Sequence, residues 1–319
     1  MRVLVTGASG FVGSYLVPAL VERGHEVYAG VMDTNYRQFN SAECISFDII
    51  DQHELREAIK STNPDGIIHL AAQSMVSRSW EKPDLTVKIN TIGTINLIGA
   101  VKKYASHAKV ITVGTSEEYG LTGKKGIPLD ETEACLPQNP YAVSKLAAGQ
   151  LALQLAHKEN LNVIHVRPFN HFGPGQARGY VVSDFASQIA KIEQGLCLPS
   201  LCVGDLSTQR DFTDVRDVIE AYVNLIENKV ENGIYNVCSG TPRRIENILT
   251  FLIKAARVPI AVQVDQQRFR PSEVPFFVGS AAKLQKCFGW KPKHNFLDSL
   301  TETLNWWRKQ DLTVAATEK

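Results

Sequence analysis

The stretch "RVLVTGASGFVGSYLVPALVERG", residues 2–24, decides the fold. Residues 3–5 form a short apolar run, which is typical of a buried strand in a parallel sheet. Leu16 and Leu20 then fall on one face of a helix, and Gly24 is placed to end that helix. The stretch therefore predicts a strand, a glycine-containing turn and a helix in immediate succession.

Three glycines with the spacing G-x-x-G-x-x-G occupy this turn. Glycines permit a tight turn and let the backbone approach a pyrophosphate, which then lies at the positive N-terminal end of the helix. A glycine pattern alone is weak evidence, but its place between a strand and a helix favours a dinucleotide site over a plain turn. We therefore predict that a dinucleotide cofactor is bound by Gly7, Gly10, Phe11, Val12 and Gly13.

Strands and helices continue to alternate through the first half of the chain. This alternation predicts an α/β fold with a doubly wound parallel Rossmann sheet, whose ligands bind at the carboxyl ends of the strands. Asp48 would bond the adenine amino group there, and Ala71 and Ala72 would let the cofactor lie close. A helix is expected over 87–104. The residues expected to face the cofactor at these ends are Asp48, Ile49, Leu70, Ala71, Ala72 and Asn90.

Two charged residues beyond the second predicted strand bear on the choice of cofactor. Asp33 has the spacing of an acid that takes the ribose hydroxyls of NAD. Arg37 follows closely and could neutralise the 2′-phosphate of NADP. Both could equally be solvated loop charges. We expect NADP(H) as the cofactor, with NAD(H) as the alternative.

The stretches "GTSEEYGL" and "PYAVSK" gather the groups expected to carry chemistry. Tyr141 and Lys145 are one helical turn apart and share a helix face. An ammonium beside a phenol, with a cationic nicotinamide nearby, favours the phenolate, so the pKa of Tyr141 should fall toward neutrality. Thr115 and Glu117 alternate along an expected strand end, which would place both side chains on one face. These four residues are the predicted catalytic group, and Tyr141 and Lys145 are also expected to contact the cofactor.

The motifs resemble those of the extended short-chain dehydrogenase/reductases that act on nucleotide sugars. The resemblance covers essentially the whole chain and rests on "TGASGFVG", "HLAAQ", "NTIGTINLI", "TSEEYG", "PYAVSK", "RPFNHFGPGQ", "RDFTDVRD", "YNVCSG" and "RPSEVP". Within that group, "FNHFGPGQ", "RDFTDVRDV" and "RPSEVP" are similar above all to the GDP-4-keto-6-deoxy-D-mannose reductases. The resemblance implies reduction of the C4 ketone of a GDP-4-keto-6-deoxyhexose by NAD(P)H, giving a GDP-6-deoxyhexose such as GDP-D-rhamnose.

The resemblance also implies a set of substrate-binding residues. Arg210 and Arg270 are expected to clamp the diphosphate through forked guanidinium contacts, with separate surface salt bridges as the alternative. Asn170 would contact sugar or phosphate oxygens, whereas the adjacent His171 could equally be a packed side chain. Glu273 would accept hydrogen bonds from a ribose or a guanine. The full expected set is Ser116, Glu117, Asn170, Arg178, Arg210, Arg270 and Glu273.

Glu117 leaves a second reaction open. A ketone reductase needs a hydride and a proton from Tyr141, whereas a 4,6-dehydratase also needs a base for the C5 proton and an acid for O6. The similar GDP-mannose 4,6-dehydratases use a Thr-x-Glu arrangement, which Thr115 and Glu117 match, together with residues matching Tyr141 and Lys145. This dehydratase is the alternative function.

Three features favour the reductase: the shorter chain, the lack of an obvious basic insertion after the second strand, and the reductase-like "FNHFGPGQ" and "RDFTDVRD". A nucleotide-sugar 4-epimerase ranks third, because those enzymes usually carry a small residue where Glu117 stands. A non-catalytic nucleotide sensor would commonly have lost Tyr141 or Lys145, and this sequence has both.

The alternation of strands and helices breaks up in the second half of the chain. We expect residues 1–165 to form the NAD(P)-binding domain, with returns near 213–238, and residues 166–319 to form mainly a substrate-binding cap. Exposed apolar positions on the helices expected at 91–104 and 141–157 would pair two subunits, as is usual in the family.

Composition excludes several classes of partner. A net charge of +1 over 319 residues gives no electrostatic case for nucleic acid or a membrane surface. No apolar run reaches the length of a bilayer span, and the start has no signal-peptide layout. The six cysteines show no metal-ligand spacing and suit a reducing cytosol. We expect a cytoplasmic homodimer that binds a GDP-linked sugar and holds no metal.

Overall fold

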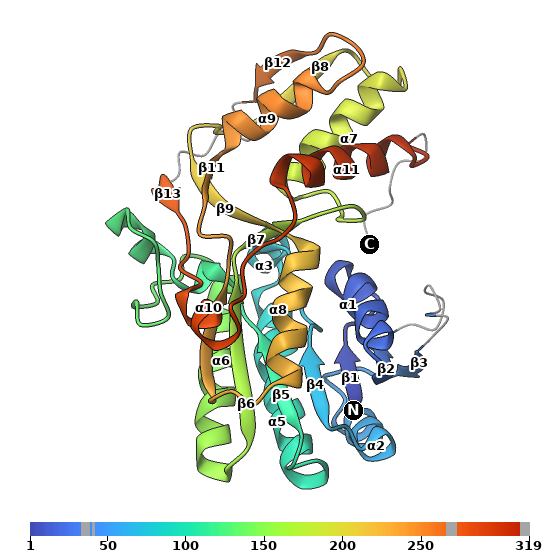
Figure 1. Cartoon of the computed structure of the whole chain (residues 1–319), viewed down its shortest axis with the longest axis vertical. Helices are drawn as coiled ribbons and strands as arrows, with labels where there is room; N and C mark the ends of the chain where they lie inside the picture. The colour runs from blue at the N-terminus through green and yellow to red at the C-terminus, as the bar shows by residue number, and fades with distance from the viewer. Residues whose placement is uncertain (33–38, 40–41, 266–272, 313–319) are drawn as a thin grey trace.

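The computed structural model describes residues 1–32, 39, 42–265 and 273–312. Three residues that the sequence marks as binding candidates, Asp33, Arg37 and Arg270, lie outside the described residues. Figure 1 shows the described chain as a large sheet wrapped by helices, with smaller sheets and further helices beyond one end of it.

Seven parallel strands form the main sheet, in the order β10-β6-β5-β4-β1-β2-β3. Its strands are β1 (Arg2–Thr6), β2 (Glu26–Val31), β3 (Glu43–Ser46), β4 (Gly66–His69), β5 (Lys109–Val113), β6 (Asn162–Pro168) and β10 (Gly233–Val237). The order reverses between β1 and β4, which is the switch point where a doubly wound sheet binds its ligand. The predicted Rossmann sheet is confirmed.

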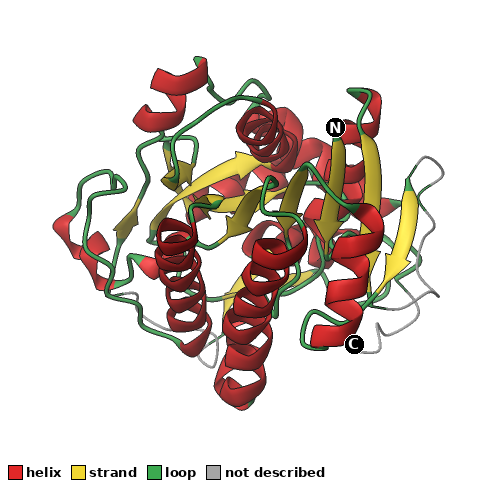
Figure 2. Cartoon of the chain, turned by 90° about the horizontal axis from the view of Figure 1, so that it is seen from below, coloured by secondary structure: helices red, strands yellow, loops and turns green. Residues whose placement is uncertain are grey.

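Helices cover both faces of this sheet, as Figure 2 shows from below. One face carries α1 (Phe11–Glu22), α8 (Val215–Glu227) and α10 (Ala282–Phe288), and the other carries α2 (Gln52–Thr62), α5 (Gly93–Tyr104) and α6 (Pro140–Glu159). In β1, Val3 and Val5 pack under the first set and Leu4 under the second, because successive strand residues point to opposite faces. Burial on both faces explains why the strand is a continuous apolar run.

The helix expected over 87–104 is interrupted near its start. The chain passes through α3 (Val76–Glu81) and α4 (Pro83–Val87) into a π-helical turn, η1 (Lys88–Ile92), before α5 begins. Asn90 lies in this turn and is 1% exposed, with its amide nitrogen donating to the Gln73 carbonyl and to Ser144 Oγ at 3.0 and 2.9 Å. The π turn therefore directs Asn90 inward, where it ties the loop after β4 to α6.

A second group of elements, which we call the cap, lies beyond the carboxyl ends of the main strands (Figure 1). Its core joins apolar residues of three helices. It consists of β7 (Asn170–Phe172), α7 (Val181–Glu193), β8 (Ser200–Val203), β9 (Gln209–Asp214), β11 (Pro242–Arg244), α9 (Ile245–Lys254), β12 (Ala261–Val264), β13 (Phe276–Phe277) and α11 (Phe296–Arg308). Between β9 and β11 the chain returns to the main sheet as α8 and β10.

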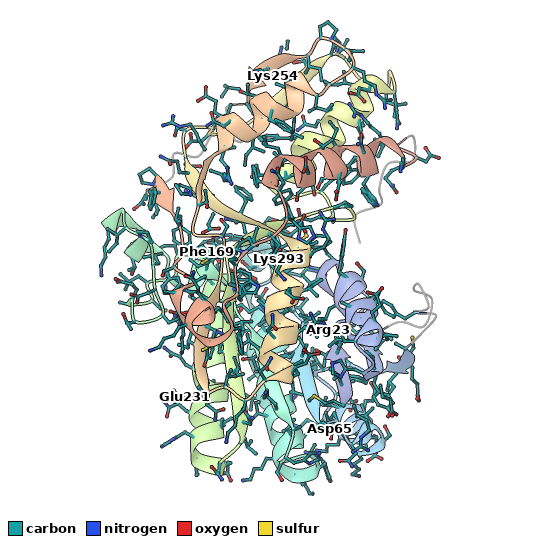
Figure 3. The ribbon with its side chains drawn as sticks, viewed as in Figure 1. Arg23, Asp65, Phe169, Glu231, Lys254 and Lys293 are labelled. Carbon is teal, nitrogen blue, oxygen red and sulfur yellow. The ribbon has the colours of Figure 1, made fainter. Side chains whose placement is uncertain are left out.

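The junction between sheet and cap is closely packed. Phe169, labelled in Figure 3, directly follows β6 and packs against Tyr119 and Phe277, with ring centroids 6.2 and 5.8 Å away. The buried carboxylate of Asp211 accepts hydrogen bonds from the backbone of Ser239 and Gly240, both at 2.8 Å. These contacts fix the cap over the edge where the strands end.

Gly13 is packed so closely that a side chain does not fit. A Cβ atom added there would overlap the carbonyl of Ala8, a backbone group of the turn before α1. We expect Gly13→Ala to lower the free energy of unfolding by about 2 kcal/mol, measured by urea unfolding.

Gly99→Ala is the matched control, because an added Cβ at this α5 position has nothing within 4 Å. It should raise stability by about 0.5–1 kcal/mol through helix propensity. Equal unfolding midpoints for the two variants would contradict the close contact at Gly13.

Candidate active site

The glycine turn after β1 touches the loop after β4. Gly7 has a φ of +67°, and a Cβ there would lie 2.7 Å from the backbone nitrogen of Ala71. The same nitrogen donates to Thr6 Oγ1 at 3.2 Å, and the Leu70 nitrogen donates to the Thr6 carbonyl at 3.1 Å. Leu70, Ala71 and the adjacent Ala72 are thus held beside the turn, as the sequence predicts for residues that face a cofactor.

The start of α1 suits a phosphate. Gly10 precedes the helix, Phe11 and Val12 form its first turn with Gly13, and no acidic side chain lies in that turn. The positive end of the helix can therefore receive an anion without repulsion. At the end of β3, Asp48 Oδ1 accepts a hydrogen bond from the Ile50 nitrogen at 2.9 Å, which orients the carboxylate. The residues of this edge fit a dinucleotide.

Thr115 does not lie on a strand. β5 ends at Val113, and Thr115 instead precedes a 3₁₀ turn, η2 (Ser116–Glu118), in which its hydroxyl accepts a hydrogen bond from the Glu117 nitrogen at 3.2 Å. The prediction that Thr115 and Glu117 share one strand face is therefore wrong. Thr115 and Ser116 are 8% and 4% exposed, whereas Glu117 points toward solvent.

Tyr141 and Lys145 lie at the start of α6, as predicted. Asn139 caps this helix by accepting a hydrogen bond from the Ala142 nitrogen at 2.8 Å, and Pro140 occupies its first position. The Thr115 hydroxyl hydrogen-bonds Tyr141. Thr115 and Tyr141 therefore meet where β5 ends, and Lys145 Nζ donates to the Val113 carbonyl at the same strand end, at 2.8 Å.

Burial dominates the pKa of Tyr141 among the protein's own groups. Burial, and next the neighbouring Tyr180, raise the pKa of Tyr141 well above its ordinary value, and the hydrogen bond from Thr115 opposes this only in part. Lys145 Nζ donates to the Val113 carbonyl at 2.8 Å. The protein's own groups therefore leave the phenol protonated at neutral pH, and the predicted fall in its pKa beside a cationic nicotinamide stays a prediction.

Glu117 belongs to the rim of the site. Its Oε2 accepts a hydrogen bond at 3.2 Å from the Asn139 amide, whose oxygen caps α6. Burial lowers the pKa of Arg210, and the Glu117 carboxylate acts against that shift. The structure thus brings Glu117 of η2 and Arg210 of β9 into the same electrostatic neighbourhood.

Two other predicted substrate residues, Asn170 and Glu273, are placed differently from each other, and His171 follows the first of them. Asn170 in β7 donates to the Asp211 carbonyl at 3.0 Å. The His171 ring stacks on Phe11 of the glycine turn, with centroids 6.3 Å apart and planes 4° from parallel. Glu273 is 71% exposed and forms an ion pair with Lys124, so the structure does not bring it to the catalytic group.

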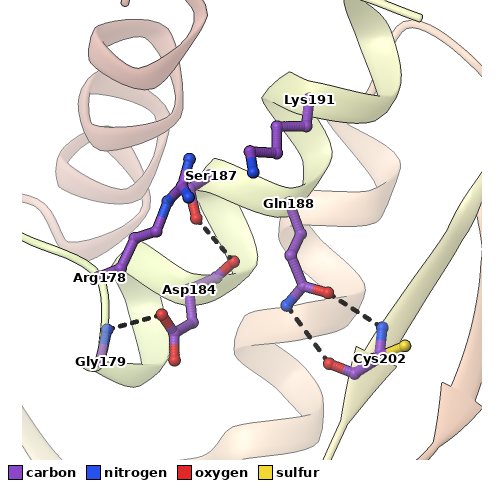
Figure 4. Close-up of a pocket in the computed structure, with 7 residues that line it drawn as sticks. All are labelled: Arg178, Gly179, Asp184, Ser187, Gln188, Lys191 and Cys202. Carbon is purple, nitrogen blue, oxygen red and sulfur yellow. Dashed lines mark hydrogen bonds between the residues drawn. The ribbon is translucent and has the colours of Figure 1, made fainter. Parts of the chain in front are cut away.

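Arg178 lines a pocket of about 560 Å³ between the loop before α7, that helix and β8 (Figure 4). Its guanidinium also lies 5.5 Å from the ring of Trp307. The other lining residues are Gly179, Asp184, Ser187, Gln188, Lys191 and Cys202. Four of these residues lie on α7 and were not predicted, although positions 184, 187, 188 and 191 repeat at the spacing of one helix face.

A further omission is Glu118, which the sequence reading passed over in favour of its neighbour. It is fully buried against two basic side chains of β6. The available signal was the pair His165 and Arg167 inside an otherwise apolar strand, since charges in a buried strand require a partner.

The described part of the chain contains no group of three side chains suited to hold a metal ion. Among the same residues, no helix is both long and apolar enough to cross a bilayer.

Comparison with known proteins identifies the family. Residues 4–303 match the family model described as GDP-mannose 4,6 dehydratase. The chain belongs to this family. Its resemblance to enzymes of nucleotide sugars, which the sequence motifs indicate, is thereby confirmed.

Individual relatives include both candidate reactions. GDP-6-deoxy-D-mannose reductase of Pseudomonas aeruginosa is 36% identical, over 97% of this chain and 98% of the relative. GDP-mannose 4,6 dehydratase 2 of Arabidopsis thaliana is 28% identical, over 99% of this chain and 88% of the relative. The solved structure of RMD from Pseudomonas aeruginosa complexed with NADPH is 35% identical, with a TM-score of 0.85 and coverage of 96% of this chain and 98% of that one.

The buried charge of Lys145 makes a prediction about stability. Burial lowers the pKa of Lys145 from 10.5 to about 8, so at pH 7 the ammonium is present in both the folded and the unfolded chain at a cost to folding. Lys145→Met removes that cost and should raise the free energy of unfolding at pH 7 by about 1–2 kcal/mol.

The difference in unfolding free energy between Lys145→Met and wild type should narrow between about pH 8 and 10.5. In this range only the unfolded wild-type chain keeps the Lys145 proton, so wild-type stability rises with pH. Urea unfolding of both proteins across this range is the measurement. Equal unfolding free energies at pH 7 would show that burial of the ammonium costs nothing.

Proposed function

We propose that the protein reduces the C4 ketone of a GDP-4-keto-6-deoxyhexose with NADPH, giving a GDP-6-deoxyhexose such as GDP-D-rhamnose. The 36% identity to GDP-6-deoxy-D-mannose reductase over 97% of the chain supports this choice of substrate. The relative solved with NADPH supports the choice of cofactor.

The observation that carries the proposal is the pairing of Tyr141 with the Thr115 hydroxyl at the start of α6. A ketone that receives a hydride becomes an alkoxide, which needs a proton at once. The Tyr141 phenol carries that proton at neutral pH, and the Thr115 hydroxyl is hydrogen-bonded to it. Thr115 and Tyr141 would together hold the carbonyl oxygen, and Tyr141 would donate the proton that completes the alcohol.

NADPH, when bound, supplies the hydride. The residues proposed to hold it are those of the glycine turn, Gly7, Gly10, Phe11, Val12 and Gly13, with Asp48, Ile49, Leu70, Ala71 and Ala72 at the neighbouring strand ends. Lys145 would donate to the nicotinamide ribose and stabilise the tyrosinate left after proton transfer. Asn90 would have an indirect role, because its hydrogen bond to Ser144 holds α6 in place next to Lys145.

Positive and polar side chains of the cap and of η2 would hold the rest of the substrate. We assign the diphosphate to Arg178 and Arg210, whose guanidinium groups suit paired phosphate oxygens. Lys191, in the pocket with Arg178, adds a third cation. Asn170 and Ser116 would contact the sugar. Arg270 and Glu273 remain part of the proposed set, and Glu273 would have to leave its ion pair with Lys124 to take part.

A GDP-mannose 4,6-dehydratase is the second candidate, favoured by the Thr115-x-Glu117 pair and by the Arabidopsis relative. That reaction starts by oxidising an alcohol, for which Tyr141 would have to accept a proton. The higher identity to the reductase relative, 36% against 28% for the dehydratase, favours the reductase. In the reductase Glu117 orients the substrate and transfers no proton.

We assign residues 1–165, together with α8 and β10, to cofactor binding, and the remainder of 166–319 to substrate binding. We further propose that the protein works in the cytoplasm. Its six free cysteines, of which Cys44, Cys197 and Cys287 are exposed, suit a reducing compartment. Recovery of the protein in a cell fraction other than the cytosol would contradict this assignment.

A homodimer would bury an apolar strip on the helices beside α5. Val87, Ile92, Val143 and Leu151 are each 40–49% exposed and come from α4, η1 and α6, which pack together. We expect sedimentation to give twice the chain mass of 35.3 kDa, and Val143→Glu to shift it to one chain. A wild-type protein sedimenting as one chain would contradict the pairing.

Substrate tests decide between the two reactions. We expect no conversion of GDP-mannose, and NADPH consumption only when GDP-4-keto-6-deoxymannose is supplied. Tyr141→Phe should lower this turnover by 10²-fold or more, because it removes the proton donor. Parallel assays with NADH determine the cofactor preference.

Formation of a keto sugar from GDP-mannose without net consumption of cofactor would establish the dehydratase instead. Turnover that survives in Tyr141→Phe would reject Tyr141 as the donor, whichever substrate is used.

A further inference from the structure

Glu118 is the last residue of η2, the turn that Thr115 precedes. Its side chain has no exposed surface. Oε1 accepts hydrogen bonds from the Thr115 backbone nitrogen at 3.0 Å and from His165 Nε2 at 3.1 Å. Oε2 accepts one from Arg167 Nε at 2.7 Å. One carboxylate therefore joins the start of η2 to two residues of β6.

Two glycines make room for this arrangement. A Cβ at Gly114, the residue before Thr115, would overlap Glu118 Oε1 and His165 Nε2. A Cβ at Gly149, in the middle of α6, would overlap the His165 ring. Glycine inside a helix is unfavourable, so its presence at 149 indicates that the space is needed for the buried pair. The local backbone is built around Glu118.

Glu118 is also the acidic group that acts on Lys145. Burial lowers the pKa of Lys145, and Glu118 is the charge that opposes this shift. The other charged or titratable groups facing the pair are His165 and Arg167 from β6, Tyr141 from α6, and His69 from β4, on which Lys145 itself acts. Cys135 faces the same carboxylate. The basic partners from β6 keep Glu118 ionised, so its charge is available to Lys145.

Building on the proposed reduction, we propose that Glu118 is a positioning residue. It holds the Thr115 backbone so that the hydroxyl meets Tyr141, and its fixed negative charge keeps Lys145 as an ammonium ion. Glu118 touches neither substrate nor cofactor in this role. It acts through Thr115 on one side and through Lys145 on the other.

Glu118→Gln separates the two effects, because the amide oxygen can still accept from the Thr115 nitrogen but carries no charge. With the negative charge removed, Lys145 loses its proton at lower pH. In a profile of kcat/KM against pH, we expect the alkaline limb to move to lower pH by roughly half a pH unit or more. Glu118→Asp, which keeps the charge, should restore the limb.

Glu193→Gln is the matched control. Glu193 is a buried carboxylate of the cap that also holds one arginine, Arg308, and one backbone nitrogen, that of Arg257. Glu193→Gln should lower the free energy of unfolding about as much as Glu118→Gln does. It should leave the alkaline limb of the kcat/KM profile unchanged. If Glu118→Gln alone does not fold, the double variant with Arg167→Met removes the unpaired guanidinium, and the same downward shift is expected.

A measurement without substrate keeps this test independent of the proposed reaction. Trace acetylation of Lys145 by acetic anhydride, followed by mass spectrometry across pH, reports its titration directly. The midpoint should be lower in Glu118→Gln than in wild type and unchanged in Glu193→Gln. Equal midpoints in all three folded proteins would overturn the role of Glu118. Failure of wild type to reduce the keto sugar, with the midpoint shifted as expected, would reject only the proposed function.

Discussion

The close approach of two backbone segments, the turn after β1 and the loop after β4, is the constraint on which the rest of the site depends. Gly7 can lie against Ala71 only because it has no side chain, and Gly13 can lie against Ala8 for the same reason. The contact brings the start of α1 to the point where the strand order reverses. The backbone proposed to bind phosphate and the strand ends proposed to face the substrate therefore lie at the same edge of the sheet.

Burial of charge is the second determinant, and it acts on several groups in the same region. Lys145 and His69 are both buried, and the charge of Lys145 acts on His69. Burial, and next the charge on Lys145, lower the pKa of His69 to about 3, so the histidine is neutral and serves as a hydrogen-bond partner of Thr6 and Thr94. Of these two groups only Lys145 is charged at neutral pH, and the Glu118 carboxylate favours that charge against the effect of burial.

Much of the fold follows from local patterns in the sequence. The apolar run of β1, the glycine spacing and the Tyr141–Lys145 pair are short-range signals, and each has its expected place in the structure. Errors arise where long-range contacts override a local pattern. Thr115 leaves the strand because the carboxylate of Glu118 caps a turn there. Glu118 itself looks like a solvated loop acid until β6 is placed beside it.

The presence of Glu117 in a reductase has an electrostatic explanation. Arg210 is partly buried, and burial lowers its pKa, a shift that the nearby Glu117 carboxylate opposes. Asn139 holds Glu117 from the other side while capping the helix of Tyr141. A diphosphate near Arg210 would then compete with Glu117 for the same cation, which would leave the carboxylate free to accept a sugar hydroxyl. Nothing in this sequence of contacts requires Glu117 to remove a proton from carbon.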